Sequence, residues 1–269
     1  MGQVWSKTII RDMRLLIILF LSFFFVSCVF KEQNKNTFQV VELNSKAEFF
    51  NLETKSIGAF SNFVRIVYKG DYRLYLVPTL RTYTDLTLSD KAINEQASRI
   101  DTIYEVFAIR NGDKKGLKYS LNNFKKEKGK VFDIDSAKEE LTLSLTDKDY
   151  ETFNYELGNP AGVFKNGKIL IEKFAIKKTG VDDIDSIYRY YNEGYKDIDF
   201  SFSKKLDQQK KSKLYKTLFV YNAIPKGINS TDVAIPRREF FRGMAKVSDK
   251  RTGIFNEIIE KFKEDRLIK

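Results

Sequence analysis

Hydrophobic and polar residues alternate most clearly in residues 62–80, which read NFVRIVYKGDYRLYLVPTL. Two runs rich in β-branched and aromatic residues flank Gly70, and this pattern predicts a β-hairpin with Gly70 in the turn. Pro78 predicts that the second strand lies at an edge or ends there, because proline has no backbone N–H to donate. Alternation places three side chains of each strand on one face: Val64, Ile66 and Tyr68 in the first, and Tyr72, Leu74 and Leu76 in the second.

Four further segments alternate in the same way and are predicted to be strands. They are residues 140–146, 168–178, 197–203 and 213–224. The last of these is apolar on both faces, which predicts a strand that is buried on both sides. Turns or loops are predicted at the lysine-rich segments 111–116 and 125–130 and around Pro160 and Gly167.

Two segments show helical spacing instead. In residues 89–107 Ser89 is a candidate N-cap, and Ile93, Ala97, Ile100 and Tyr104 recur every three or four residues. Residues 253–269 carry a similar apolar stripe of Ile254, Ile258, Ile259 and Phe262. The fold class predicted from these elements is α+β: a mainly antiparallel β-sheet packed with at least two amphipathic helices in a single domain.

The most apolar run of the chain, residues 14–30, contains its single cysteine, Cys28. A transmembrane helix with a buried thiol needs roughly 20 apolar residues, and this run is shorter and includes two serines. A secretion signal fits better, because a cationic segment precedes the apolar core and a small residue precedes the cysteine. The cationic residues are Lys7, Arg11 and Arg14.

The sequence FVSC at residues 25–28 resembles the bacterial lipobox, in which the cysteine is lipidated and becomes the mature N-terminus. Phe25 departs from the usual leucine, as in the relaxed lipoboxes of spirochaetal lipoproteins. An alternative, myristoylation of Gly2 in MGQVWS, would be cytosolic and would leave the export signal unexplained. The predicted division is therefore a signal peptide (1–27), a polar tether and lead-in (28–50) and a globular domain (51–269).

The composition limits the chemistry that the chain can perform. It contains no histidine, which excludes Ser-His-Asp triads and histidine-ligated metal sites. With Cys28 committed to lipid, thiolate catalysis and intrachain disulfides are excluded as well. No cofactor is predicted. An enzyme built from the remaining residues would depend on carboxylates, lysine, tyrosine or a Ser-Lys dyad.

The chain is also basic, with a formal net charge of +11. Removing the signal lowers Lys plus Arg from 47 to 44 and Asp plus Glu from 36 to 35, so the mature chain carries +9. This charge is compatible with an anionic partner such as a glycosaminoglycan or acidic lipids, or with lysines spread over every solvated face.

Acidic residues give two weak candidates. Asp182, Asp183 and Asp185 lack the glycine and the distal glutamate of a calcium loop, so an acidic turn or a helix start explains them better and no metal is predicted. Asp197 and Asp199 are spaced to lie on one face of a strand, as a glycosidase pair would be, but their separation and partners are invisible in the sequence.

Aromatic and basic residues mix in SIYRYYNEGY and PRREFFRG. If exposed, such side chains anchor protein interfaces or stack on sugars; otherwise the rings lie in the core and the arginine stems cover its edge. The candidate binding residues are Tyr188, Arg189, Tyr190, Tyr191, Arg237, Arg238, Phe241 and Arg242.

The relaxed lipobox, the short polar tether and the Lys/Asn/Phe/Ile-rich body together resemble the outer-membrane lipoproteins of Lyme and relapsing-fever spirochaetes. Within that group, the mature region is similar to the virulent-strain-associated lipoprotein family of antigens. The resemblance implies a lipid-anchored protein of the outer membrane that faces the host. The missing catalytic repertoire favours a non-enzymatic surface protein that binds a host protein or an anionic polysaccharide and no specific nucleic acid. A periplasm-facing lipoprotein in envelope assembly and a carboxylate-based hydrolase are the alternatives.

Overall fold

The computed structural model describes residues 37–89, 92–142, 157–177, 184–228 and 233–267. The chain divides into two units, Met1–Phe38 and Gln39–Lys269, and the second contains the whole sheet. The first strand begins at Gln39, within the segment expected as tether and lead-in. No helix in these described ranges is long and apolar enough to cross a membrane. Cys28 lies outside them.

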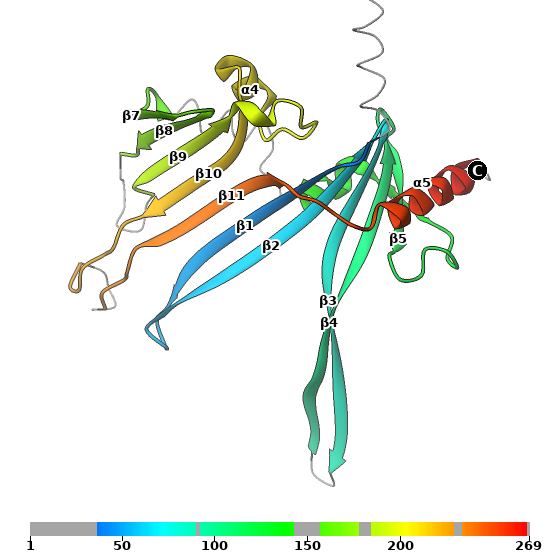
Figure 1. Cartoon of the computed structure of the whole chain (residues 1–269). Coiled ribbons are helices and arrows are strands. Elements are labelled where there is room, and N and C mark those ends of the chain that lie inside the picture. Colours follow the sequence, from blue (N-terminus) through cyan, green and yellow to red (C-terminus); the bar gives the residue numbers. More distant parts are fainter. Residues whose placement is uncertain (1–36, 90–91, 143–156, 178–183, 229–232, 268–269) are drawn as a thin grey trace, which may run out of the picture. The chain divides into compact units, whose positions relative to one another are not determined.

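Eleven antiparallel strands form one sheet in the order β6-β5-β4-β3-β2-β1-β11-β10-β9-β8-β7 (Figure 1). Strands β1–β6 and β7–β11 each follow one another in chain order, and pairing of β1 with β11 joins the two series. The strands are β1 (Gln39–Asn51), β2 (Ser56–Lys69), β3 (Tyr72–Ser89), β4 (Ala92–Arg110), β5 (Lys115–Ser120), β6 (Lys130–Asp133), β7 (Gly162–Asn166), β8 (Ile169–Ala175), β9 (Ser186–Asn192), β10 (Lys213–Tyr221) and β11 (Arg238–Lys246).

Three α-helices accompany the sheet in the described residues: α2 (Ile134–Thr142), α4 (Lys204–Lys210) and α5 (Thr252–Leu267). The α+β class and the mainly antiparallel sheet are therefore confirmed. Within the described ranges the helices are few, and most residues of the domain lie in strands.

The hairpin predicted around Gly70 is confirmed by β2 and β3. Gly70 has φ 55°, a left-handed conformation that glycine adopts without strain, and it supplies the tight turn. The predicted strand end at Pro78 is wrong, because β3 runs on to Ser89. Pairing with β2 stops at Leu76, however, and β3 continues beside β4 alone, so Pro78 does lie where one edge becomes unpaired.

The helix predicted for residues 89–107 is wrong, since these residues finish β3 and form most of β4. β4 pairs with β3 along its whole length, from Tyr72↔Arg110 to Ser89↔Ala92. Within this segment, the consecutive residues Val106 and Phe107 are both buried, which suits a strand with core on each face of the sheet. Pairing with β3 has overridden the local spacing.

Two other predicted strands differ from the structure. Residues 197–203 form an irregular segment before α4, although Ile198 and Phe202 are buried as their hydrophobicity suggests. Ser203 caps α4, because its hydroxyl accepts a hydrogen bond from the Leu206 N–H at 3.3 Å. Of residues 140–146, those up to Thr142 belong to α2, and the rest lie outside the described residues. The strands predicted within 168–178 and 213–224 are confirmed as β8 and β10.

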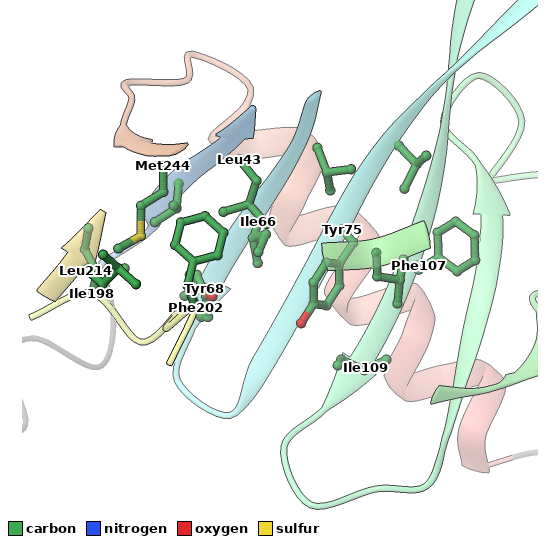
Figure 2. Packing of buried hydrophobic residues seen from close by; sticks show 14 of the residues in the cluster. Leu43, Ile66, Tyr68, Tyr75, Phe107, Ile109, Ile198, Phe202, Leu214 and Met244 are labelled. Carbon is green, nitrogen blue, oxygen red and sulfur yellow. The ribbon is translucent and has the colours of Figure 1, made fainter. Parts of the chain in front are cut away.

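The sheet buries side chains on both faces. Its α4 face, against which α2 and α4 pack, carries the main core, and Figure 2 shows this cluster gathered along the strands. Labelled members include Leu43, Ile66, Tyr68, Tyr75, Phe107, Ile198, Phe202, Leu214 and Met244.

The opposite face, called here the α5 face, is covered over β2 to β5 by the C-terminal helix. The predicted apolar stripe of α5 is confirmed at Ile258, Ile259 and Phe262. Ile254 is 38% exposed, and Phe255 takes its place against the sheet. The Phe262 ring meets Tyr72 edge-on, with ring centroids 6.2 Å apart.

A buried carboxylate, Asp265, fixes the end of α5. It accepts hydrogen bonds from the Tyr119 hydroxyl at 3.1 Å and the Gly129 N–H at 3.0 Å, and it pairs with Lys261 at 2.9 Å. Burial by itself raises the pKa of Asp265, but these three donors outweigh burial and hold the pKa below its ordinary value.

Candidate binding surface

Strand alternation sorts the sequence-predicted binding residues onto opposite faces of the sheet. Tyr188, Tyr190 and Phe241 lie on the α5 face, beyond the part that α5 covers, and all three are partly exposed. Arg189, Tyr191, Arg238 and Arg242 lie on the α4 face. The seven candidates that lie in strands therefore do not share one face of the sheet, and Arg237 precedes β11 and pairs with Glu239.

The α5 face of β8–β11 carries what we call the aromatic–lysine surface. It consists of Lys173, Tyr188, Tyr190, Tyr215, Lys216 and Phe241. The Lys216 ammonium lies between two rings, 5.2 Å from the centroid of Tyr190 and 5.0 Å from that of Phe241. Lys173 sits in the same way 5.6 Å from the ring centroid of Tyr188. Lysines and aromatic rings thus contact one another across four neighbouring strands.

A β-bulge in β10 brings one more ring to this surface. The pairing of β10 with β9 shifts between Leu214 and Lys216, so Tyr215 is the extra residue. Tyr215 and Lys216 both contact Tyr190, the ring of Tyr215 edge-on with a centroid separation of 6.2 Å. The ring centroid of Tyr195 lies 5.5 Å from that of Tyr215, and both rings also pack against the main core. The bulge therefore places Tyr215 where it contacts both Tyr190 and the core.

Ion pairing leaves this surface positively charged. Lys173 and Lys216 make no ion pair with any residue in the described ranges, whereas the nearby acidic groups are neutralised. Glu239 pairs with Arg237 at 2.5 Å, and Glu48 pairs with Lys46 at 2.8 Å. An approaching anion therefore meets two lysines whose charge is not already balanced by a carboxylate.

The tyrosines of this surface stay neutral phenols well above neutral pH. Burial raises the pKa of Tyr190, and the charges of Tyr188 and Glu239 add to that effect. Burial also raises the pKa of Tyr215, followed by the influence of Tyr190 and Tyr195. A neutral phenol offers a hydroxyl that can donate or accept a hydrogen bond and a ring face on which a sugar can stack.

On the α4 face the arginines cover aromatic rings. Arg238 lies over Tyr221 at 5.5 Å and Arg242 over Phe240 at 5.3 Å, so the expectation that arginine stems cover the edge of a core holds here. Arg189 is buried against Phe174, with its guanidinium carbon 4.9 Å from the ring centroid.

Tyr191, next to Arg189 in β9, is fully buried. Burial and the nearby Glu172 carboxylate raise the pKa of Tyr191.

The acidic candidates form no paired site. Asp182 and Asp183 lie outside the described residues, while Asp185 accepts a hydrogen bond from the Asn222 N–H at a strand end. Asp197 binds the Lys246 ammonium at 2.7 Å, and the strand expected to align it with Asp199 is absent. No group of acidic side chains in the described part of the chain could hold a metal ion.

Sequence reasoning missed Lys173, Tyr215 and Lys216 as parts of this surface. Lys216 shares its face of β10 with the buried Leu218 and Val220, and such apolar neighbours suggest core. The sequence signal that could have identified Lys216 is its position within an otherwise apolar strand. A charge in such a strand needs either a partner or solvent.

No protein-family model matches the chain, and a search of curated proteins finds no match to it.

Proposed function

We propose that the protein is a non-enzymatic, lipid-anchored binding protein of the bacterial outer membrane, attached through Cys28, whose aromatic–lysine surface binds an anionic polysaccharide. The position of Lys216 between the rings of Tyr190 and Phe241 carries this proposal. Rings supply flat apolar area to sugars, and unpaired ammonium groups attract sulfates and carboxylates.

The anchor in this proposal comes from the sequence. The basic segment, the apolar run and the FVSC motif at 25–28 favour lipidation of Cys28, and the resemblance to spirochaetal lipoproteins favours the outer membrane. Several acyl chains on one cysteine hold a protein durably to a membrane, since each buried CH₂ contributes about 0.8 kcal/mol.

The absence of histidine and the arrangement of carboxylates favour binding over catalysis. The cavity between α4, β8 and β9 contains one carboxylate, Glu172, which is paired with Lys210. Glycoside hydrolysis ordinarily uses two carboxyl groups across the scissile bond. A carboxylate-based hydrolase is therefore the weaker proposal.

Heparin binding of the full chain, purified in detergent, tests the surface. We expect saturable binding that weakens as salt rises, because exposed charges are screened. The double variant Lys173→Gln/Lys216→Gln should bind more weakly and with a shallower salt dependence. The matched control Lys165→Gln/Lys204→Gln removes two exposed lysines outside the surface and should bind like the unmodified protein. An equal loss of heparin affinity in both double variants would show that the net charge of the protein, and not this surface, attracts heparin.

The location is tested on intact cells. Proteinase K digestion, with mass spectrometry of the N-terminal peptide, should remove the protein and show an acylated Cys28. If Cys28 is acylated but the protein survives the protease, the result would favour the alternative, a periplasm-facing lipoprotein in envelope assembly. An unmodified Met1 or an acylated Gly2 would refute the anchor.

A further inference from the structure

The end of the β1–β2 hairpin carries a cluster of exposed apolar side chains that the proposed polysaccharide site does not use. Its four large members, called here the apolar tip, are Phe49, Leu52, Ile57 and Phe60, which are 38%, 49%, 43% and 72% exposed. A group of large apolar side chains in contact with water commonly marks a protein or membrane interaction site. The apolar tip is therefore a candidate for a second interaction.

The tip lies on a two-stranded ribbon and not on a face of the sheet. β1 pairs with β11 as far as Ala47, and β2 pairs with β3 only from Arg65 onward. Within the described part of the chain, β1 and β2 then continue beside each other alone to the pair Asn51↔Ser56, as the blue and cyan strands of Figure 1 show. The apolar tip is thus the free end of a hairpin.

Apolar side chains lie on both sides of this ribbon. The register places Phe49 and Phe60 on the α4 face and Ile57 on the α5 face, with Leu52 in the turn. The rings of Phe49 and Phe60 stack with centroids 4.9 Å apart, and the Phe49 ring lies over Gly58, where any side chain would collide with it. A protein partner docks against one face, whereas a bilayer surrounds an inserted ribbon on every side. The arrangement therefore favours a lipid partner.

The turn of the hairpin can leave water at little electrostatic cost. The side-chain oxygen of Asn51 accepts hydrogen bonds from the N–H groups of Glu53 at 2.9 Å and Thr54 at 3.0 Å, so these donors need no water. Residues 49–60 contain one acid, Glu53, and one base, Lys55, and are neutral overall, whereas the mature chain carries +9. A neutral apolar segment in a basic chain suits the interior of a membrane better than an anionic partner.

The proposed anchor keeps the domain within reach of a bilayer. Gln39 stands 11 positions after Cys28, so the intervening chain spans at most about 40 Å. The 13 residues of β1 span about 44 Å. The end of the hairpin can therefore meet the anchoring bilayer when β1 and β2 lie along the membrane surface.

We propose that the apolar tip inserts into the bilayer that carries the lipid on Cys28 and forms a second attachment of the domain to it. This inference rests on the lipid anchor of the proposed function. Two attachments, one beyond each end of β1, restrain the orientation of the domain on the membrane, which a single lipid anchor does not.

Quenching of tryptophan fluorescence by brominated phosphatidylcholine tests this insertion, with the full chain incorporated into vesicles. Trp5 is the only tryptophan of the chain, so Trp5→Phe/Phe60→Trp carries a single reporter in the apolar tip. The matched control is Trp5→Phe/Phe164→Trp, because Phe164 is a 56% exposed phenylalanine on β7. We expect bromine on the acyl chains to quench the reporter at position 60 and to leave the reporter at position 164 unquenched.

Three results of this measurement would overturn the proposal. They are equal quenching at the two positions, no quenching at position 60, and a blue shift at position 60 without quenching, which would assign the tip to a protein partner.

A charge placed in the tip gives a second test. With Leu52→Trp as the reporter in the Trp5→Phe chain, Phe60→Asp should shift the equilibrium between inserted and free tip about tenfold toward the free tip, because it replaces a large apolar side chain. Phe164→Asp, the matched control, should leave the quenching unchanged. Equal losses of quenching in the two aspartate variants would contradict insertion of the tip.

Mass spectrometry of the N-terminal peptide from the same vesicles separates this proposal from the anchor. An unmodified Cys28 together with a quenched reporter at position 60 would refute the anchor and support the tip as a membrane contact. An acylated Cys28 together with an unquenched reporter would keep the anchor and overturn the tip.

Discussion

The α5 face of the sheet is used in two different ways along its width. Over β2 to β5, helix α5 covers it, and the strands contribute Val67, Leu74, Leu76 and Val106, all fully buried. Over β8 to β11, no helix in the described ranges covers this face, and partly exposed tyrosine, phenylalanine and lysine side chains lie there beside the buried Leu218 and Val220. One continuous sheet therefore combines a region built for packing with a region whose aromatic and lysine side chains stay partly exposed.

The difference lies in the kind of apolar residue that each region uses. Branched aliphatic side chains have no polar group and gain free energy only by leaving water. Tyrosine and lysine combine an apolar body with a polar end, so they remain soluble while offering contact area. Substitutions should consequently reduce the free energy of unfolding in the first region and ligand affinity in the second.

The largest expected effect is on stability in the covered region. Phe255→Ala should lower the free energy of unfolding by about 3–5 kcal/mol, because it removes a fully buried ring and leaves a cavity. Chemical denaturation measures this loss. The matched comparison is Phe241→Ala, in the region that α5 does not cover, which should lower the free energy of unfolding much less. An equal loss of stability would show that this region is also core.

The next effect concerns the carboxylate that fixes the end of α5. Asp265→Asn should cost about 1–3 kcal/mol, because it weakens hydrogen bonds to a buried group. Since the pKa of Asp265 is lowered in the folded protein, its stabilising effect is present above the ordinary aspartate range and is lost as pH falls through the folded-state pKa. Unfolding free energies measured from neutral to acidic pH should converge for the variant and the unmodified protein, and a constant difference would contradict this assignment.

A smaller effect is expected on binding in the region that α5 does not cover. Tyr190→Ala should weaken heparin binding about fivefold, near 1 kcal/mol, with little change in unfolding free energy. Tyr190→Phe keeps the ring beside Lys216 and should retain most of the affinity. If both variants bind equally weakly, the hydroxyl and not the ring makes the contact.

The smallest effect is expected from the arginines of the opposite face. Arg238→Gln and Arg242→Gln should each change heparin affinity by less than about twofold, because these side chains lie over rings on the α4 face. Heparin-affinity chromatography at several salt concentrations measures this. A loss of heparin affinity as large as that of Tyr190→Ala would show that the polysaccharide binds on the α4 face and would contradict our proposal.

The elements that the sequence predicted correctly are those whose pattern is local. Gly70 between two alternating runs identified a hairpin, and the closing segment identified α5. The pattern in residues 89–107 failed because the spacing of its apolar residues fits a helix, whereas pairing with β3, which this spacing does not encode, makes the segment a strand. Pairing of β1 with β11 joins residues about 200 positions apart, such as Val41 and Lys246, and no local pattern encodes it.

Part of the candidate surface was also predictable, because its residues stand close together in the sequence. Tyr188, Tyr190 and Phe241 were named as candidates with their exposure left open, and in the structure they are partly exposed, with Lys173 near Tyr188 and Lys216 near Tyr190 and Phe241. Alternation within β9 separates Arg189 and Tyr191 from them, and a correct strand assignment would have revealed this. The contribution of Tyr215 depends on the bulge in β10, which the sequence does not mark with a glycine.

The pairing of β1 with β11 also constrains how the chain reaches its folded state. The two series of strands can form from neighbouring segments, but the contact that unites them closes a loop of about 200 residues and must await synthesis of β11. Until then β1 and β10 each present an unpaired edge, which is a template for association with other chains. Under the proposed export, this contact would form only after the chain has crossed the membrane, and the interval before it forms would be the time when the chain most needs protection from aggregation.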